Sequence, residues 1–341
     1  MLMKIIRIFF LGFTLLIVFL VVATLGAYRF NTPSVLLTEE RIFVIPVGES
    51  FSSIAERLQE EGIIKSAILF KIFGKLKKTE KSIKKGYYLI KPNSTALQIH
   101  DLLISGQEIL KKVTIPEGWT SRQISELLEE KGFSEKEEFL KYVNDDSFLR
   151  TLGIFSGTAE GYIFPDTYYF PEEYPPSKIL AHMIATFFNR LEELKPDYKT
   201  LTPVELQDKI ILASVVEREY RVEEEAPIIA SVFYNRLSIG MPLQSCATVA
   251  YVISEIMKKP YPDRLFYRDL EIDSPYNTYK YPGLPILPIC NPSATAIKAV
   301  FYPAKTNYLF FVIQDLAEGK HYFSKTLSEH SNAFSLFVKK R

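Results

Sequence analysis

The hydropathy pattern opens with a long apolar segment. Residues 8–28 contain no charged side chain, whereas Lys4 and Arg7 precede this run and Arg29 follows it. At roughly 1.5 Å per helical residue, the run would span about 31 Å, which matches a bilayer core. It therefore predicts a single transmembrane anchor. A cleaved signal peptide is the alternative, but its apolar region is usually shorter and ends at a small-x-small site, which this run lacks.

The charges beside the anchor predict its orientation. Lys4, Arg7 and the terminal amine favour a cytoplasmic N-terminus, although Arg29 weakens the asymmetry. We expect a short cytoplasmic tail at 1–7, the anchor at 8–28 and a linker at 29–40. Because so short a tail cannot fold, the working part is expected outside the cytoplasmic (inner) membrane, in the periplasm or an equivalent extracytoplasmic space.

A repeated pattern follows the anchor. Residues 45–62 align without gaps to residues 115–132, and each copy reads as a short strand, a turn at a glycine and an amphipathic helix. Ser50 and Thr120 are the predicted helix N-caps. The two copies therefore predict two small β-α modules, the second within 113–170.

Further positions extend the repeat. Gly62 and Gly132 stand where a C-terminal helix glycine is expected. Residues 86–90 and 161–165 are predicted as the matching later strands. A longer helix is expected over about 176–194.

One apolar run ends in a carboxylate. Residues 210–216 are apolar or small, and Glu217 follows directly, with Glu219 two residues further on. A carboxyl group joined to a buried run loses solvation, which raises its pKa and makes it a candidate general acid. The alternative is a core helix whose charged end emerges into solvent.

Composition narrows the function. The chain has 341 residues, enough for two or more folded units, and a formal net charge of +1, which argues against a nucleic-acid partner. Its four histidines form no HExxH and no Cys/His pairing, so we expect no metal site. No Walker loop or GxGxxG is present, and no cofactor is expected. The only cysteines, Cys246 and Cys290, either pair or stay free, since spacing in sequence does not give their separation.

The second half carries an ordered set of motifs. The motifs are EGYIFPDTYY at 160–169, LASVVERE at 212–219, ASVFYNRLSIGMPLQ at 230–244, SPYNTY at 274–279, GLP at 283–285 and PAKTNYLFFV at 303–312. This set resembles the YceG-like family of endolytic murein transglycosylases, and residues 41–92 resemble a LysM module, which binds N-acetylglucosamine-containing glycans. The resemblance implies an α+β protein with a LysM-like domain at 41–112 and a mixed α/β catalytic domain at 113–341.

The resemblance also implies a reaction. Such an enzyme cuts the bond between N-acetylmuramic acid and N-acetylglucosamine in peptidoglycan, and the catalytic glutamate of the family falls on Glu217. One carboxyl group suffices if it first protonates the glycosidic oxygen and then accepts the proton of the muramic acid 6-hydroxyl. The expected partners are nascent glycan strands and the peptidoglycan synthases, with a role in terminating chain elongation. The open alternatives are a non-catalytic scaffold and a hydrolase that pairs Glu217 with Glu160 or Asp166.

The other candidate site residues are less defined. We expect Glu219 to tune the acid, or to form a surface ion pair. Asn235 and Gln244 are candidates for sugar binding or for fold stabilisation, and Glu160 lies in a family motif. The stretch Tyr276, Asn277, Thr278 and Tyr279 is expected to line the cleft, because tyrosine stacks on sugar faces. The chain departs from the family pattern at Cys246-Ala247, where Asp-Pro is usual, and in the loop before Cys290.

Overall fold

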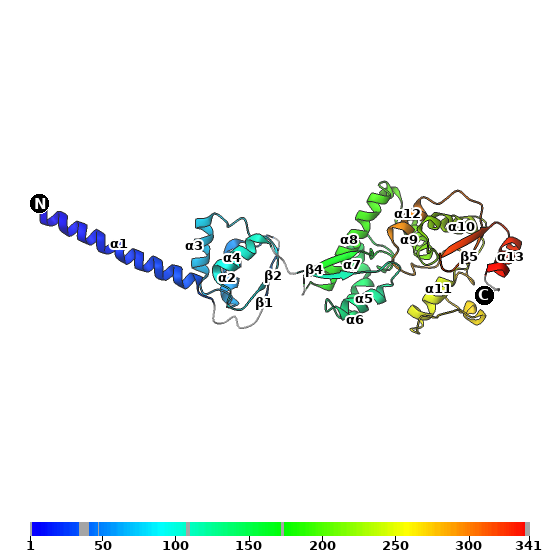
Figure 1. The fold of residues 1–341 in the computed structure, drawn as a ribbon, viewed down its shortest axis with the longest axis horizontal. Helices are drawn as coiled ribbons and strands as arrows, with labels where there is room; N and C mark the ends of the chain where they lie inside the picture. The colour runs from blue at the N-terminus through cyan, green and yellow to red at the C-terminus, as the bar shows by residue number, and fades with distance from the viewer. Residues whose placement is uncertain (1, 34–40, 47, 107–109, 172–173, 338–341) are drawn as a thin grey trace. The chain divides into compact units, whose positions relative to one another are not determined.

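The computed structural model describes residues 2–33, 41–46, 48–106, 110–171 and 174–337. The chain divides into two compact units, Met1–Lys111 and Lys112–Arg341, each traced in Figure 1. Most of the predicted linker at 29–40 lies outside the described residues.

Helix α1 (Leu2–Asn31) includes the whole of the apolar run at 8–28. The side chains at several of its positions, 8–11 among them, lie outside the described set. Across the described residues, no helix combines the length and the apolar character that crossing a membrane requires.

The first unit is built on a two-stranded sheet. Strand β1 (Arg41–Ile45) pairs antiparallel with β2 (Gly86–Ile90), so that Arg41 lies opposite Ile90. Helices α2 (Phe51–Glu60) and α3 (Ala67–Lys77) stand between the strands in sequence, and α4 (Ala96–Ser105) follows β2. Alternate residues of β2 are buried, as expected for a sheet with one covered face. The core of this unit includes Phe43, Ile54, Leu58, Phe70 and Tyr88.

The predicted helix boundaries of the repeat are confirmed. The hydroxyl of Ser50 accepts from the amide of Ser53 at the start of α2. Thr120 forms a capping box with Gln123 at the start of α5 (Ser121–Glu130). Gly62 and Gly132 both follow the helix ends with φ of 71°. The expected strand at 86–90 is β2.

The expected strand at 161–165 is wrong. The second unit instead pairs β3 (Leu110–Thr114) with β4 (Thr167–Pro171), which begins after this segment. The amides of Gly161 and Ile163 both donate to the side-chain oxygen of Asn291, each at 2.9 Å, in place of a strand partner. Gly161 has φ of 90°, which a regular strand does not use.

Helices dominate the second unit. Helix α9 (Pro203–Glu217), α10 (Ala226–Ser238) and α12 (Ala294–Phe301) pack pairwise against one another (Figure 1). Helix α8 occupies Pro176–Leu194, as predicted, and packs against α6 (Lys136–Val143) and α12. The shorter elements are α7 (Asp146–Thr151), η1 (Tyr198–Thr200), η2 (Glu223–Glu225), α11 (Cys246–Tyr251), the π-helical turn η3 (Val252–Ile256) and η4 (Tyr267–Glu271).

The C-terminal region completes the unit with a hairpin. Strand β5 (Phe310–Asp315) pairs antiparallel with β6 (Lys320–Ser324), and α13 (Leu327–Phe337) packs against both. Within the described residues, all three sheets are two-stranded and most of the regular structure is helical. The mixed α and β character predicted from the sequence is therefore confirmed.

Candidate active site

Helix α9 delivers the candidate acid from the core to its edge. Residues 210–216 of this helix are all buried, because α10 and α12 pack against it. The helix begins at a capping box formed by Thr202 and Glu205 and ends at Glu217, which is partly buried. A carboxylate at a helix C-terminus faces the negative end of the helix dipole, which disfavours its charged form. The apolar run thus places Glu217 at a position that favours its protonated form.

Glu217 is held through one of its two oxygens. Its Oε2 accepts from the amide of Ser293 at 2.9 Å, from the hydroxyl of Ser293 at 2.6 Å and from the hydroxyl of Tyr220 at 3.3 Å. Ser293 is the N-cap of α12, and its hydroxyl also lies 2.9 Å from the Tyr220 hydroxyl. Within the described part of the chain, no hydrogen bond reaches Oε1 of Glu217. The fixed oxygen orients the carboxyl group and leaves the other available to a substrate.

The surroundings of Glu217 raise its pKa. Burial is the largest cause, and the nearby charge of Glu117 adds to it. The donors from Ser293 and Tyr220 favour the carboxylate and limit the rise. A carboxyl group balanced in this way can donate a proton and then take one back.

A turn of the second β-α module lies against this acid. Gly118 has φ of 68°, and a Cβ built on it would come within 3.4 Å of both Glu217 Cγ and Arg218 Nη1. The turn is tied in place, because the Gly118 amide donates to the carbonyl of Asn291 at 3.0 Å. A Nη1 of Arg218 also donates to the Gly118 carbonyl at 3.2 Å. Glycine is favoured here by the positive φ, and the turn lies within van der Waals reach of Glu217 and Arg218.

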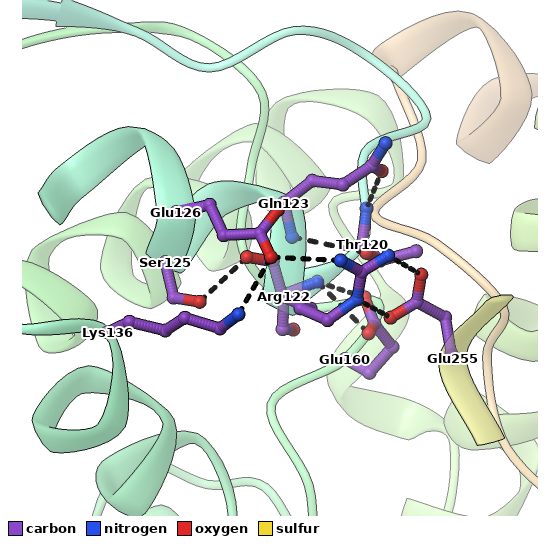
Figure 2. A network of polar contacts seen from close by, with 9 residues as sticks. Thr120, Arg122, Gln123, Ser125, Glu126, Lys136, Glu160 and Glu255 are labelled. Atoms are coloured by element: carbon purple, nitrogen blue, oxygen red, sulfur yellow. Dashed lines mark hydrogen bonds and ion pairs between the residues drawn. The ribbon is translucent and has the colours of Figure 1, made fainter. Parts of the chain in front are cut away.

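A pocket of about 180 Å³ opens on the Arg218 side of this turn. One wall is the network in Figure 2, in which Arg122 of α5 binds Glu255 of η3 with two hydrogen bonds of 2.7 and 2.8 Å. Arg122 also pairs with Glu126, which Lys136 contacts as well. The network thus joins the second β-α module to the segment that follows α11. The other lining residues are Gly118, Thr120, Gln123, Arg218, Ala247, Tyr251, Ser254, Tyr261 and Ile289.

Glu219 faces a different partner from Glu217. It accepts a short hydrogen bond from the hydroxyl of the buried Ser245. Burial raises the pKa of Glu219 to about 7, while Ser245 and the charge of Arg236 oppose the rise. Glu219 therefore links the end of α9 to the loop before α11.

Two candidate substrate-binding residues, Asn235 and Asn277, use their side-chain amides to bind backbone carbonyls. The Asn235 amide donates to the carbonyls of Thr306 and Tyr308 at 3.0 and 2.9 Å. The buried Asn277 amide donates to the carbonyls of Leu270 and Ile272, both at 2.8 Å. These contacts anchor loops.

The neighbouring candidates differ in exposure. The Thr278 hydroxyl accepts from the Ser245 amide and is buried. Gln244 is exposed, with φ of 50°, and its backbone amide donates to the Thr278 carbonyl. The ring of Tyr276 lies 5.0 Å from that of Tyr251, a residue of the pocket. Of these three candidates, only Gln244 is exposed.

Glu160 occupies the interior. Its exposed fraction is 6%, and both of its oxygens accept from the Ser121 amide at 3.1 Å, at the positive end of α5 (Figure 2). A second donor is the side-chain amide of Asn291 at 2.9 Å. Burial raises the pKa of Glu160 to about 8 against these donors. Through these contacts, Glu160 connects α5 to the segment before α12.

The cysteines are both free. The Cys246 thiol lies 3.0 Å from the hydroxyl of Tyr279, whereas the buried Cys290 thiol donates to the Ser214 carbonyl at 3.3 Å. The structure thus has no Cys246–Cys290 bond. Among the described residues, no group of three or more metal-ligating side chains is gathered at one place.

Several site residues lie beyond the sequence prediction. Tyr220, Ser293 and Glu117 all act on Glu217 but were not predicted. For Gly118, the repeat predicts only the turn before a helix. The local signal is Ser293 itself, because a serine directly before an apolar helical stretch is a favoured N-cap.

The comparisons with known proteins agree with the sequence resemblance. The profile of the YceG-like family matches residues 43–335, and the chain belongs to this family. It is 32% identical over 312 residues to the endolytic murein transglycosylase of Bacillus subtilis, covering 86% of this chain and 84% of that protein. It is also 32% identical to a Streptococcus pneumoniae protein of the same name, but spans only 56% of its length.

A solved structure is also similar. The crystal structure of a YceG-like protein from Listeria monocytogenes shares 30% identity and a TM-score of 0.57 with this chain. The match covers 86% of this chain and 99% of that one.

Proposed function

We propose that this chain is an endolytic lytic transglycosylase. It would cleave the bond between N-acetylmuramic acid and N-acetylglucosamine inside glycan strands and leave a 1,6-anhydro end. The observation that carries the proposal is Glu217, a partly buried carboxyl group that is fixed through Oε2 and that has no hydrogen bond at Oε1 from the described residues. The names of the Bacillus and Streptococcus relatives support the same activity.

The geometry suits one carboxyl group in two roles. Protonated Glu217 gives its proton from Oε1 to the glycosidic oxygen, and the bond to the muramic acid C1 breaks. The 6-hydroxyl oxygen of the same sugar attacks the cationic C1, and the Glu217 carboxylate takes the hydroxyl proton. The glutamate is thereby reprotonated, and no water is consumed. Ser293 and Tyr220 hold the carboxylate between the two proton transfers.

The hydrolase alternative needs a further group. Glu160 has both oxygens occupied in the interior, and Asp166 accepts from the Thr167 amide and lies 3.8 Å from Arg190. Among the described residues, no hydrogen bond or ion pair joins either of them to Glu217. The charge of Glu117 acts on Glu217, so Glu117 is the candidate second carboxylate for a hydrolase.

Product analysis tests the proposal. Purified full-length protein is incubated with uncross-linked glycan strands, and the new ends are identified by mass spectrometry. Anhydro ends that disappear in Glu217→Gln support the transglycosylase. Reducing ends would establish a hydrolase, and a lack of cleavage would favour a glycan-binding scaffold.

We also propose the cellular setting that the sequence predicts. The uncharged run at 8–28 supports an inner-membrane anchor with the catalytic unit outside the cytoplasm. The β1-α2-α3-β2 order of the first unit supports a LysM-like glycan-binding role for it. An anchored enzyme would act on strands near the synthases and end their elongation. Longer glycan strands in cells that carry Glu217→Gln would support this role, and unchanged lengths would contradict it.

A further inference from the structure

The pocket beside Glu217 carries a positive charge that no ion pair neutralises within the described residues. Its charged lining residues are Arg122, Glu255 and Arg218. Arg122 neutralises Glu255 through a two-bond contact, so this pair adds no net charge. Arg218 instead donates to two neutral oxygens, the Gly118 carbonyl at 3.2 Å and the Tyr261 hydroxyl at 3.0 Å. Among the described residues, it forms no ion pair.

Arg218 is held in place over the pocket. Its guanidinium lies 5.5 Å from the centre of the Tyr261 ring, as in a cation–π contact. Together with the two hydrogen bonds, this contact limits the rotamers that the side chain can adopt. A pre-ordered guanidinium loses little entropy when it binds a carboxylate, for which its planar fork is suited.

The position of the pocket relates it to the bond that is cut. Gly118 lines the pocket and also lies against Glu217. A single residue therefore separates the pocket from the acid in space. In the proposed substrate, the sugar that is cut at C1 also bears a lactyl group, to which a short peptide with free carboxylates is attached. The peptide therefore leaves the strand close to the reacting carbon.

The pocket has room to continue. Tyr261 also lines a wider groove of about 800 Å³ formed by residues 253–272. Its lining includes Lys259, Arg264 and Arg268, with Asp263 and Asp269 as the acidic members. An extended anionic chain that enters at Arg218 can therefore pass Tyr261 into a groove with a cationic excess.

We propose that this pocket binds a carboxylate of the stem peptide and that Arg218 selects peptide-bearing strands over bare glycan. The proposal rests on the proposed function, since it names the substrate class of the same site. Arg218 contacts the substrate but not the reacting atoms, so it is a specificity residue.

Three substrates and three variants test this selection. The substrates are strands with intact peptides, strands whose peptide carboxylates are converted to amides, and strands stripped of peptide by an amidase. The rates of anhydro-end formation are compared for the wild type, Arg218→Gln and Arg218→Lys. Arg150→Gln is the matched control, because Arg150 is an exposed arginine that pairs with Asp146. Thermal melting establishes that each variant is folded.

The expected result is a ratio of kcat/KM values between the substrates. The wild type should cut the carboxylate-bearing strands about tenfold faster, in kcat/KM, than either other substrate, as one charge-assisted contact provides. Arg218→Gln should bring this ratio close to one, and Arg218→Lys should retain part of it. A wild type without preference, or an Arg218→Gln variant that slows all three substrates equally, would overturn the proposal.

Binding separates this proposal from the activity. Glu217→Gln protein is titrated with a soluble disaccharide-peptide and with its amidated form. About tenfold weaker binding of the amidated form, lost on adding Arg218→Gln, supports the pocket even if no strand is cut. Equal binding of both forms would contradict it, whatever the products of the reaction are.

Discussion

The two β-α modules begin alike and serve different ends. Gly48 and Gly118 both adopt positive φ, 83° and 68°, at the turn before a capped helix. A Cβ on Gly48 would meet nothing within 4 Å, whereas one on Gly118 would meet Glu217 and Arg218 at 3.4 Å. The same local pattern therefore makes a turn without neighbours in one module and a wall of the candidate site in the other.

The helices that follow show the same contrast. At the start of α2, the neighbouring Glu49 binds the Ser53 hydroxyl and Arg57, all within a few residues. At the start of α5, the carboxylate comes from the distant Glu160, and Asn291 joins it. A repeated sequence thus specifies an element, while its partners decide whether that element takes part in chemistry.

The largest effect should come from the acid that the second turn contacts. Glu217→Gln should lower kcat for anhydro-end formation by about a thousandfold or more, because the amide cannot donate the proton. Glu219→Gln is the matched control and should cost about tenfold or less, since Glu219 binds Ser245. Equal losses in the two variants, measured by product chromatography, would contradict the assignment of Glu217.

Glu160 should make the second module sensitive to pH. Its folded-state pKa of about 8 lies above the ordinary value of 4.5. Its stabilising contribution is therefore full below pH 4.5 and lost as the pH rises through about 8, a change of a few kcal/mol. Glu160→Gln should flatten the fall in melting temperature between pH 5 and 9. An unchanged slope in calorimetry would show that Glu160 does not titrate there.

A pair of glycine substitutions tests the comparison directly. Gly118→Ala and Gly48→Ala should each cost about 1 kcal/mol of stability, because alanine disfavours positive φ. Only Gly118→Ala should also lower kcat, by about tenfold, because relief of the strained φ would shift the turn that contacts Glu217 and Arg218. Steady-state kinetics and thermal melting of both variants decide the matter. A similar kcat for the two would mean that the second turn does not constrain the site.

The smallest effect should come from the hydroxyl that orients the acid. Ser293→Ala removes one donor to the Glu217 carboxylate and leaves the backbone amide. The pKa of Glu217 should rise, so the decline of activity on the alkaline side should move to higher pH, with a severalfold lower kcat. Ser293→Thr keeps the hydroxyl and should restore the wild-type pH profile. A Ser293→Ala profile identical to wild type would exclude this role.

Much of the fold was predictable because its causes are local. The caps at Ser50 and Thr120 and the glycines after α2 and α5 act over three or four residues. The helix expected at 176–194 is also found, as α8. The strand expected at 161–165 failed for the opposite reason, because Asn291, far along the chain, takes the amides of that segment.

The candidate site divides in the same way. By itself, the sequence determined that a carboxyl group, Glu217, ends a buried helix, since an apolar run of that kind must be covered. Only the tertiary structure decided that Ser293 and Tyr220 hold one oxygen of Glu217 and that Gly118 lies against this acid. It also decided that Glu160 binds the Ser121 amide and that Asn235 binds the Thr306 carbonyl. Most of these contacts join segments tens of residues or more apart, so no local periodicity or cap records them; the packing of α9 against α12 brings Ser293 to Glu217.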